Sequence, residues 1–71
     1  MDVVFEVTKD MQTFCDEIFN NGYIVKISTI KMPRLSKNKI KMDCYTIVYD
    51  GLLFTLVRVP KRWIYIYVDN L

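Results

Sequence analysis

Basic side chains are the residues of this chain with the clearest potential for chemistry, and half of them fall in one short stretch. Five of the ten Lys and Arg residues lie between positions 31 and 41, namely Lys31, Arg34, Lys37, Lys39 and Lys41. Pro33 interrupts the stretch, since proline cannot donate to a strand ladder. We therefore expect a basic loop at about 31–39, which would neutralise phosphate groups or steer toward an acidic surface. A third interpretation is a merely solvated loop.

Catalytic and metal chemistry find little support in the residue types. The 71 residues include no His, so the usual general base and the usual nitrogen ligand are both missing. Cys15 and Cys44 are too far apart for a CxxC pair, and both fall at inward-facing positions, which predicts buried, reduced thiols. Asp16 and Glu17 are adjacent on the predicted helix and point about 100° apart, which predicts a solvated acidic face. We expect no enzyme, no catalytic residue, no metal and no cofactor.

Length and composition predict one globular domain spanning 1–71. Hydrophobic residues make up 52% and charged residues 25% of the chain, as in folded proteins. The longest apolar run, 52–57, is far shorter than the roughly 18 residues that cross a bilayer, and the first residues do not resemble a signal peptide. We expect a cytoplasmic protein without a membrane partner. Alanine is absent, and residues with AT-rich codons are abundant, which favours a bacteriophage or viral source and hence the host cytoplasm.

The spacing of apolar residues predicts one amphipathic helix after position 10. Its apolar stripe consists of Met11, Phe14, Cys15, Ile18 and Phe19. Thr8 or Asp10 is expected to cap this helix, and Gly22 to end it in a left-handed conformation.

Alternation of apolar and polar residues predicts five strands around that helix. They are expected at 2–8, 23–31, 39–49, 52–59 and 62–69. In the strand at 23–31, Tyr23, Val25 and Ile27 are expected to share one face. The predicted fold class is α+β, in the order β-α-β-β-β-β, with the helix packed on one face of a mostly antiparallel sheet.

Two turns fix the register of the last three strands. Asp50-Gly51 between apolar runs predicts a primed two-residue hairpin, which pairs Tyr49 with Leu52, Ile47 with Phe54, Tyr45 with Leu56, Cys44 with Val57 and Asp43 with Arg58. A two-residue turn at Pro60-Lys61 would pair Val57 with Ile64, Leu56 with Tyr65, Thr55 with Ile66 and Phe54 with Tyr67. Pro-Lys is not a favoured hairpin turn, so a longer loop with a shifted register is the alternative.

This register sorts the sheet into two different faces. One is aliphatic, with Met42, Cys44, Val48, Leu53, Val57, Val59, Ile64, Ile66 and Val68. The other is aromatic, with Tyr45, Ile47, Tyr49, Leu52, Phe54, Leu56, Trp63, Tyr65 and Tyr67. One helix covers one face, and we expect it to cover the aliphatic one, because purely apolar side chains lose most by contact with water. The alternative is that the sheet closes, or the loop folds over, and buries the aromatic residues.

An open aromatic face beside a basic loop predicts a binding protein. We expect a small non-catalytic protein that docks on a larger macromolecule, chiefly a larger protein, as a viral or phage-type modulator or inhibitor of a host protein. The expected partner-binding residues are Lys31, Arg34, Lys37, Lys39, Lys41, Tyr45, Phe54, Arg58, Trp63, Tyr65 and Tyr67. The alternative is a single-stranded RNA or DNA binder, in which the same cations neutralise phosphates and the aromatic rings stack on bases. A homodimer that buries the aromatic face is a third alternative.

Overall fold

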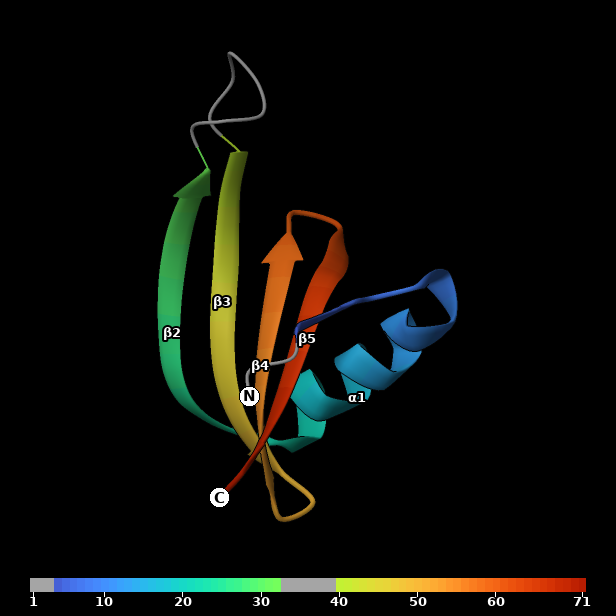
Figure 1. The fold of residues 1–71 in the computed structure, drawn as a ribbon, viewed down its shortest axis with the longest axis vertical. Coiled ribbons are helices and arrows are strands. Elements are labelled where there is room, and N and C mark those ends of the chain that lie inside the picture. The colour runs from blue at the N-terminus through green and yellow to red at the C-terminus, as the bar shows by residue number, and fades with distance from the viewer. Residues whose placement is uncertain (1–3, 33–39) are drawn as a thin grey trace.

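One helix packs on a five-stranded antiparallel sheet (Figure 1). The computed structural model describes residues 4–32 and 40–71, with side chains described at 4–29 and 41–71. The elements are β1 (Val4–Glu6), a 3-10 turn (Lys9–Met11), α1 (Gln12–Asn21), β2 (Tyr23–Met32), β3 (Ile40–Tyr49), β4 (Leu52–Val59) and β5 (Arg62–Asn70). The strand order is β1-β5-β4-β3-β2. The predicted α+β class is confirmed, and no helix in the described residues is long and apolar enough to span a bilayer.

The β3–β4 hairpin has the predicted turn and register. Asp50 and Gly51 have φ values of 51° and 75°, so both central residues are left-handed, as a primed two-residue turn requires. The two strands pair as expected from Tyr49 opposite Leu52 to Asp43 opposite Arg58. The local turn chemistry was therefore sufficient to fix this register.

The two-residue turn at Pro60-Lys61 is confirmed, since Val59 pairs with Arg62, but the predicted pairs of β4 and β5 beyond it are wrong by one residue. A bulge between Val57 and Arg58 places Arg58 opposite Trp63 but Val57 opposite Tyr65, which leaves Ile64 without its own partner. Because side chains alternate along a strand, the extra residue changes which face the later side chains occupy. The observed pairs that replace the predicted ones are Val57 with Tyr65, Leu56 with Ile66, Thr55 with Tyr67 and Phe54 with Val68.

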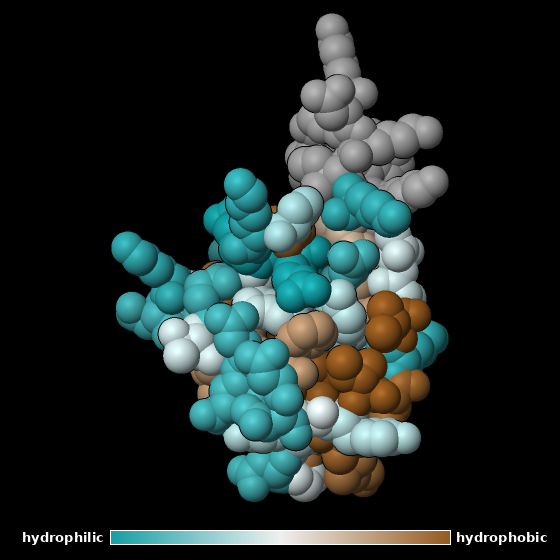
Figure 2. All heavy atoms as spheres, turned by 180° about the vertical axis from the view of Figure 1, so that it is seen from behind, coloured by the Kyte–Doolittle hydropathy of each residue, from teal (hydrophilic) through white to brown (hydrophobic). Residues whose placement is uncertain are grey.

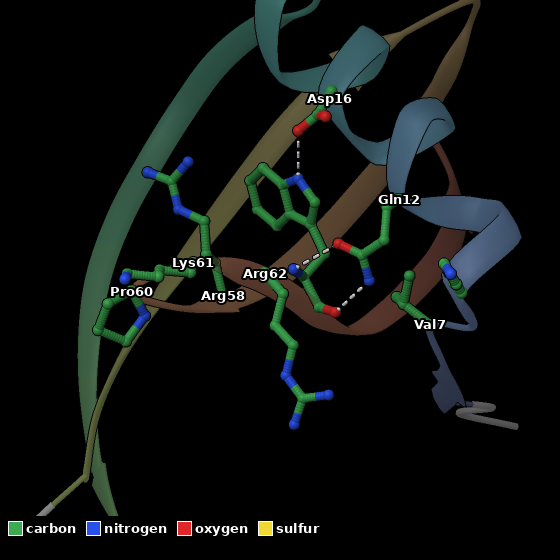
Figure 3. A pocket seen from close by; sticks show the side chains of 9 residues that line it. Val7, Gln12, Asp16, Arg58, Pro60, Lys61 and Arg62 are labelled. Atoms are coloured by element: carbon green, nitrogen blue, oxygen red, sulfur yellow. Dashed lines mark hydrogen bonds between the residues drawn. The ribbon is translucent and has the colours of Figure 1, made fainter.

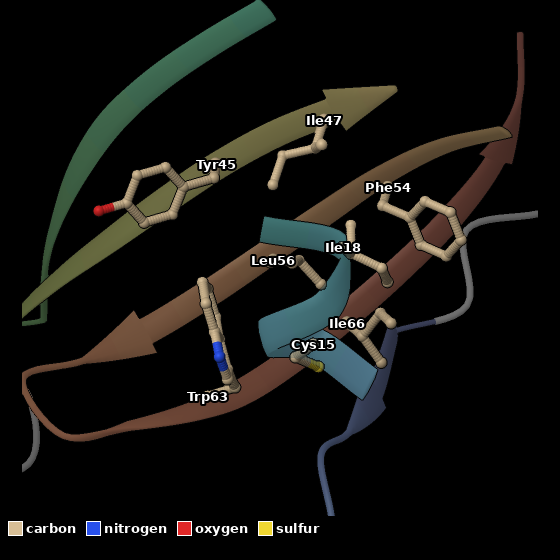
Figure 4. Packing of buried hydrophobic residues seen from close by; sticks show 8 residues of the cluster. All are labelled: Cys15, Ile18, Tyr45, Ile47, Phe54, Leu56, Trp63 and Ile66. Atoms are coloured by element: carbon tan, nitrogen blue, oxygen red, sulfur yellow. The ribbon is translucent and has the colours of Figure 1, made fainter. Parts of the chain in front are cut away.

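The helix covers the aromatic face, so the predicted open aromatic face is wrong. The buried cluster joins Cys15 and Ile18 of α1 to six sheet residues, Tyr45, Ile47, Phe54, Leu56, Trp63 and Ile66 (Figure 4). Burial of the large rings is tolerated because their polar atoms find partners. Trp63 Nε1 donates to Asp16 Oδ1 at 2.8 Å, and Tyr45 Oη accepts from Arg58 at 2.8 Å. The sheet ends in two edge strands, so it is the helix and not closure of the sheet that covers these residues.

The two ends of α1 differ from the predicted ones. Neither Thr8, before the 3-10 turn, nor Met11, before α1, makes a side-chain capping hydrogen bond. Gly22 has φ −78°, which is extended and not left-handed. Glycine is needed there for space, because a Cβ would overlap Ile47 Cγ2 and lie 2.6 Å from the Ile18 carbonyl oxygen.

Candidate binding surfaces

The outer edge of β5 is covered by three different groups. β1 pairs with β5 along its own length, and the Val7 N–H then donates to the Ile64 carbonyl at 2.9 Å. Further along, the Gln12 side chain takes the place of a strand residue. Its Oε1 accepts from the Trp63 N–H at 2.9 Å, and its Nε2 donates to the Trp63 carbonyl at 2.7 Å. The backbone of this edge is therefore occupied through the bulge.

The other edge of the sheet, β2, has no such cover in the part of the chain that the structure describes. The strand is 10 residues long and pairs with β3 alone. Its apolar side chains are strongly exposed, with Tyr23 at 72%, Val25 at 50% and Ile27 at 62%. A long edge strand with unpaired backbone groups and apolar side chains is a template for pairing with another chain.

A bulge divides the exposed side chains of β2 between both sides of the sheet. The register shifts between Ile24 and Lys26, so Tyr23 lies opposite Val48 while Ile27 lies opposite Tyr45. The predicted common face for these side chains is therefore wrong. Seen from behind, apolar side chains gather on the side of the molecule where β2 lies (Figure 2).

A basic hollow of about 540 Å³ lies where the β4–β5 turn meets the start of α1 (Figure 3). Its charged lining residues are Lys9, Asp16, Arg58, Lys61 and Arg62, a net charge of +3. In Figure 3, Arg58, Lys61 and Arg62 extend in different directions from the turn. Arg58 and Lys61 both line the hollow.

The guanidinium of Arg58 is held among three aromatic rings. Its central carbon lies 4.7 Å from the ring centroid of Phe19, 5.1 Å from that of Tyr45 and 4.8 Å from that of Trp63. Cation–π contacts of this kind are worth about 0.5–2 kcal/mol each, depending on solvation. Within the described residues the guanidinium donates to one group, Tyr45 Oη. Most of its five N–H donors therefore make no hydrogen bond to the described residues.

The described residues show no centre for nucleophilic or metal chemistry. Cys15 is fully buried, and burial, with a smaller effect of the Asp16 carboxylate, raises the pKa of its thiol to about 11. Cys44 is only half-buried, contrary to expectation, and both thiols are free. The Tyr49 hydroxyl donates to Glu17 Oε2 at 2.8 Å, which raises the pKa of that phenol. No group of three His, Cys, Asp or Glu that could hold a metal ion occurs in the described residues.

The predicted partner-binding residues do not form one surface. Tyr45, Phe54 and Trp63 are 8%, 5% and 2% exposed beneath α1. Tyr65 and Tyr67 are half-buried on the opposite face.

The predicted cations are also spread over separate places. Arg58 lines the hollow, and Lys41 is exposed on β3. Lys31 pairs with Lys41 in the backbone ladder of β2 and β3. Arg34, Lys37 and Lys39 lie outside the described residues.

Sequence reasoning named Arg58 and Trp63 but missed the other residues around the hollow, and it missed the exposed edge. A signal existed for the hollow, because Arg58, Lys61 and Arg62 form a second basic cluster within five positions. Gln12 and Asp16 are four residues apart, which places them on one face of the helix. No local signal marks β2 as an edge strand, because its neighbours in the sheet depend on the whole topology.

Comparison with protein-family models, with curated proteins and with solved structures found no match to this chain.

Proposed function

We propose that this chain is a small non-catalytic binding protein that docks on a larger protein through the edge strand β2. One observation carries the proposal: among the described residues β2 is a 10-residue strand with no partner on its outer side, and it exposes Tyr23, Val25 and Ile27, whereas the other edge strand, β1, has only three residues. This asymmetry makes β2 the longer edge for pairing.

The proposed contact is the addition of a partner strand to β2. Backbone N–H and C=O groups along the outer side supply hydrogen bonds, and the exposed side chains supply apolar contacts that select the partner. Folded proteins commonly protect long edges with charges, bulges or proline. Among the described side chains of β2, Lys26 is the one charge, and the bulge next to it leaves the positions from 27 onward in regular pairing with β3.

A finer form of the proposal is a viral or phage-type modulator or inhibitor of a host protein. Its support is the composition, namely the small size, the absence of alanine and the abundance of residues with AT-rich codons. Docking on a larger host protein through one strand needs little chain, which suits a domain of 71 residues.

A second candidate function is binding of single-stranded RNA or DNA on the face away from α1. What favours it is the position of Tyr65 and Tyr67, which alternate along β5 and share that face. Arg58 and the hollow belong to the other face, so they cannot neutralise the phosphates of bases stacked on these two rings. Phosphate binding predicts an affinity that falls steeply with salt. Absence of oligonucleotide binding at low salt would exclude this candidate.

The test of the first proposal places a charge in the exposed edge. A protein partner is first identified by pull-down and mass spectrometry. Ile27→Lys should abolish binding to it, because the lysine would have to be buried in the interface between β2 and the partner strand. Val68→Lys is the matched control, since Val68 is an exposed aliphatic residue of β5, at 40%. Circular dichroism should remain native for both variants.

The outcomes separate three explanations. Loss of binding in Ile27→Lys with retention in Val68→Lys supports docking on β2. Equal binding by both variants contradicts it. If light scattering gives a dimer for the wild type and a monomer for Ile27→Lys, the partner strand is the β2 of a second copy and the larger-protein proposal is wrong.

A further inference from the structure

We propose that the basic hollow between the β4–β5 turn and α1 is a binding site for carboxylates, which an acidic segment of a protein would supply. Arg58 and Lys61 make the principal contacts, and Lys9 and Arg62 add to the positive potential. The site lies on the helix side of the sheet, away from the outer edge of β2. This inference and the proposed function can therefore fail separately.

The first argument is electrostatic. Lys9, Arg58, Lys61 and Arg62 line one hollow, and none of them has a carboxylate within 4.0 Å among the described residues. Asp16 is the one acidic lining residue, and its Oδ1 already accepts from Trp63. Like charges in one concave region repel each other and attract a compact anion, because the low-dielectric walls focus the field.

The second argument is that Arg58 is already in a binding conformation. Three ring contacts between 4.7 and 5.1 Å and the hydrogen bond to Tyr45 hold the guanidinium in place. A free arginine side chain loses rotamer entropy when it is fixed. Since the fold has already ordered this side chain, its planar fork can meet a carboxylate with two parallel hydrogen bonds at little further entropic cost.

The third argument concerns the class of ligand. Nucleic acids bind single-strand sites through phosphate contacts together with stacking of bases on aromatic rings. The aromatic residues at this hollow offer no ring face for stacking, because Trp63 is 2% and Tyr45 8% exposed and Arg58 lies over both rings. Carboxylates need no such surface. The geometry therefore favours an acidic protein segment over a nucleic acid.

The experiment is an NMR titration of the full chain with three probes, namely a short glutamate-rich peptide, its glutamine counterpart and an oligothymidylate. The Arg58 Nε–Hε signal and backbone amides of the β4–β5 turn report on the hollow, and those of β2 report on the other surface. We expect the glutamate peptide alone to shift the signals of the hollow. Its affinity should fall about tenfold or more in Arg58→Met, the cost of one charged hydrogen-bonding group.

A variant at the exposed turn keeps the test independent of folding. Lys61→Glu should weaken the glutamate peptide severalfold, whereas Lys41→Glu, the same charge change at an exposed position outside the hollow, should leave the affinity unchanged. Equal losses in the two variants would mean general attraction to net charge and would overturn the site. Tighter binding of the oligothymidylate than of the glutamate peptide would overturn the ligand class, and no shift with any probe would overturn the proposal.

Discussion

Removing the Gln12 amide should destabilise the domain by about 1–3 kcal/mol. In the wild type this side chain forms two hydrogen bonds with the Trp63 backbone, at 2.7 and 2.9 Å, in a partly buried position. Each neutral hydrogen bond contributes about 0.5–1.5 kcal/mol net, and Gln12→Ala deletes both. For a domain of this length, 1 kcal/mol corresponds to about 4–8 °C in Tm, so we expect a decrease of about 5 to 20 °C.

The measurement is thermal unfolding by circular dichroism together with amide hydrogen exchange. The Trp63 N–H donates to Gln12 in the wild type, so its exchange should accelerate in Gln12→Ala more than that of the neighbouring β4 amides. Thr13→Ala is the control, because Thr13 is exposed on the same helix and its hydroxyl group has no hydrogen-bonding partner in the described structure. It should change stability by less than about 0.5 kcal/mol. An unchanged Tm and unchanged Trp63 exchange in Gln12→Ala would refute the role of this side chain as a substitute strand residue.

Two further predictions concern the close packing of α1. Gly22→Ala should lower stability by about 1–3 kcal/mol in a denaturant melt, since its Cβ meets both Ile47 and the Ile18 carbonyl. Cys15 should resist alkylation at neutral pH, while the half-buried Cys44 reacts first. The raised Cys15 pKa also predicts a pH effect. The folded state disfavours its thiolate, so the associated stability is complete below about pH 9, the unfolded value, and is lost as pH rises toward about 11.

Each of these has a simple control. Asn20→Ala, at an exposed helix position, should leave the denaturant midpoint nearly unchanged. A midpoint for Gly22→Ala that is equally unchanged would contradict the steric argument. For the thiols, mass spectrometry after a short exposure to iodoacetamide identifies the modified residue. Modification of Cys15 as fast as Cys44 would show that the helix does not protect it. Cys15→Ser should remove a part of the stability loss between pH 9 and 11.

Local sequence signals predicted the elements and one register well, because those depend on neighbouring residues. The β-branched and aromatic runs identified the strands, and Asp50-Gly51 fixed the β3–β4 pairing through its left-handed turn. The β4–β5 register failed where no local signal existed. The bulge at Val57 and Arg58 is a property of the assembled hairpin and cannot be read from Pro60-Lys61 alone.

The covered face was mispredicted because aromatic residues were treated as tolerant of water. The deciding contacts are long-range ones, in which Asp16 satisfies the indole of Trp63 and Arg58 satisfies Tyr45. These contacts make burial of the large rings favourable, and they appear only once helix and sheet are in place. The candidate hollow follows from the same contacts, which is why only its cations, and not its shape, could be foreseen.

Because of the bulge opposite Val57, the alternation of side chains between the two faces of the sheet has one phase before Ile64 in β5 and another after it. Trp63 and Ile66 are three positions apart, so in a regular strand they would face opposite sides, yet both lie in the core under α1. Ile64, which has no partner of its own on β4, is the extra residue that separates the two phases. Loss of Ile64 would leave Trp63 and Ile66 two positions apart, so both could stay in the core of a regular strand without the bulge, and a residue added beyond Asn70 would alter neither phase.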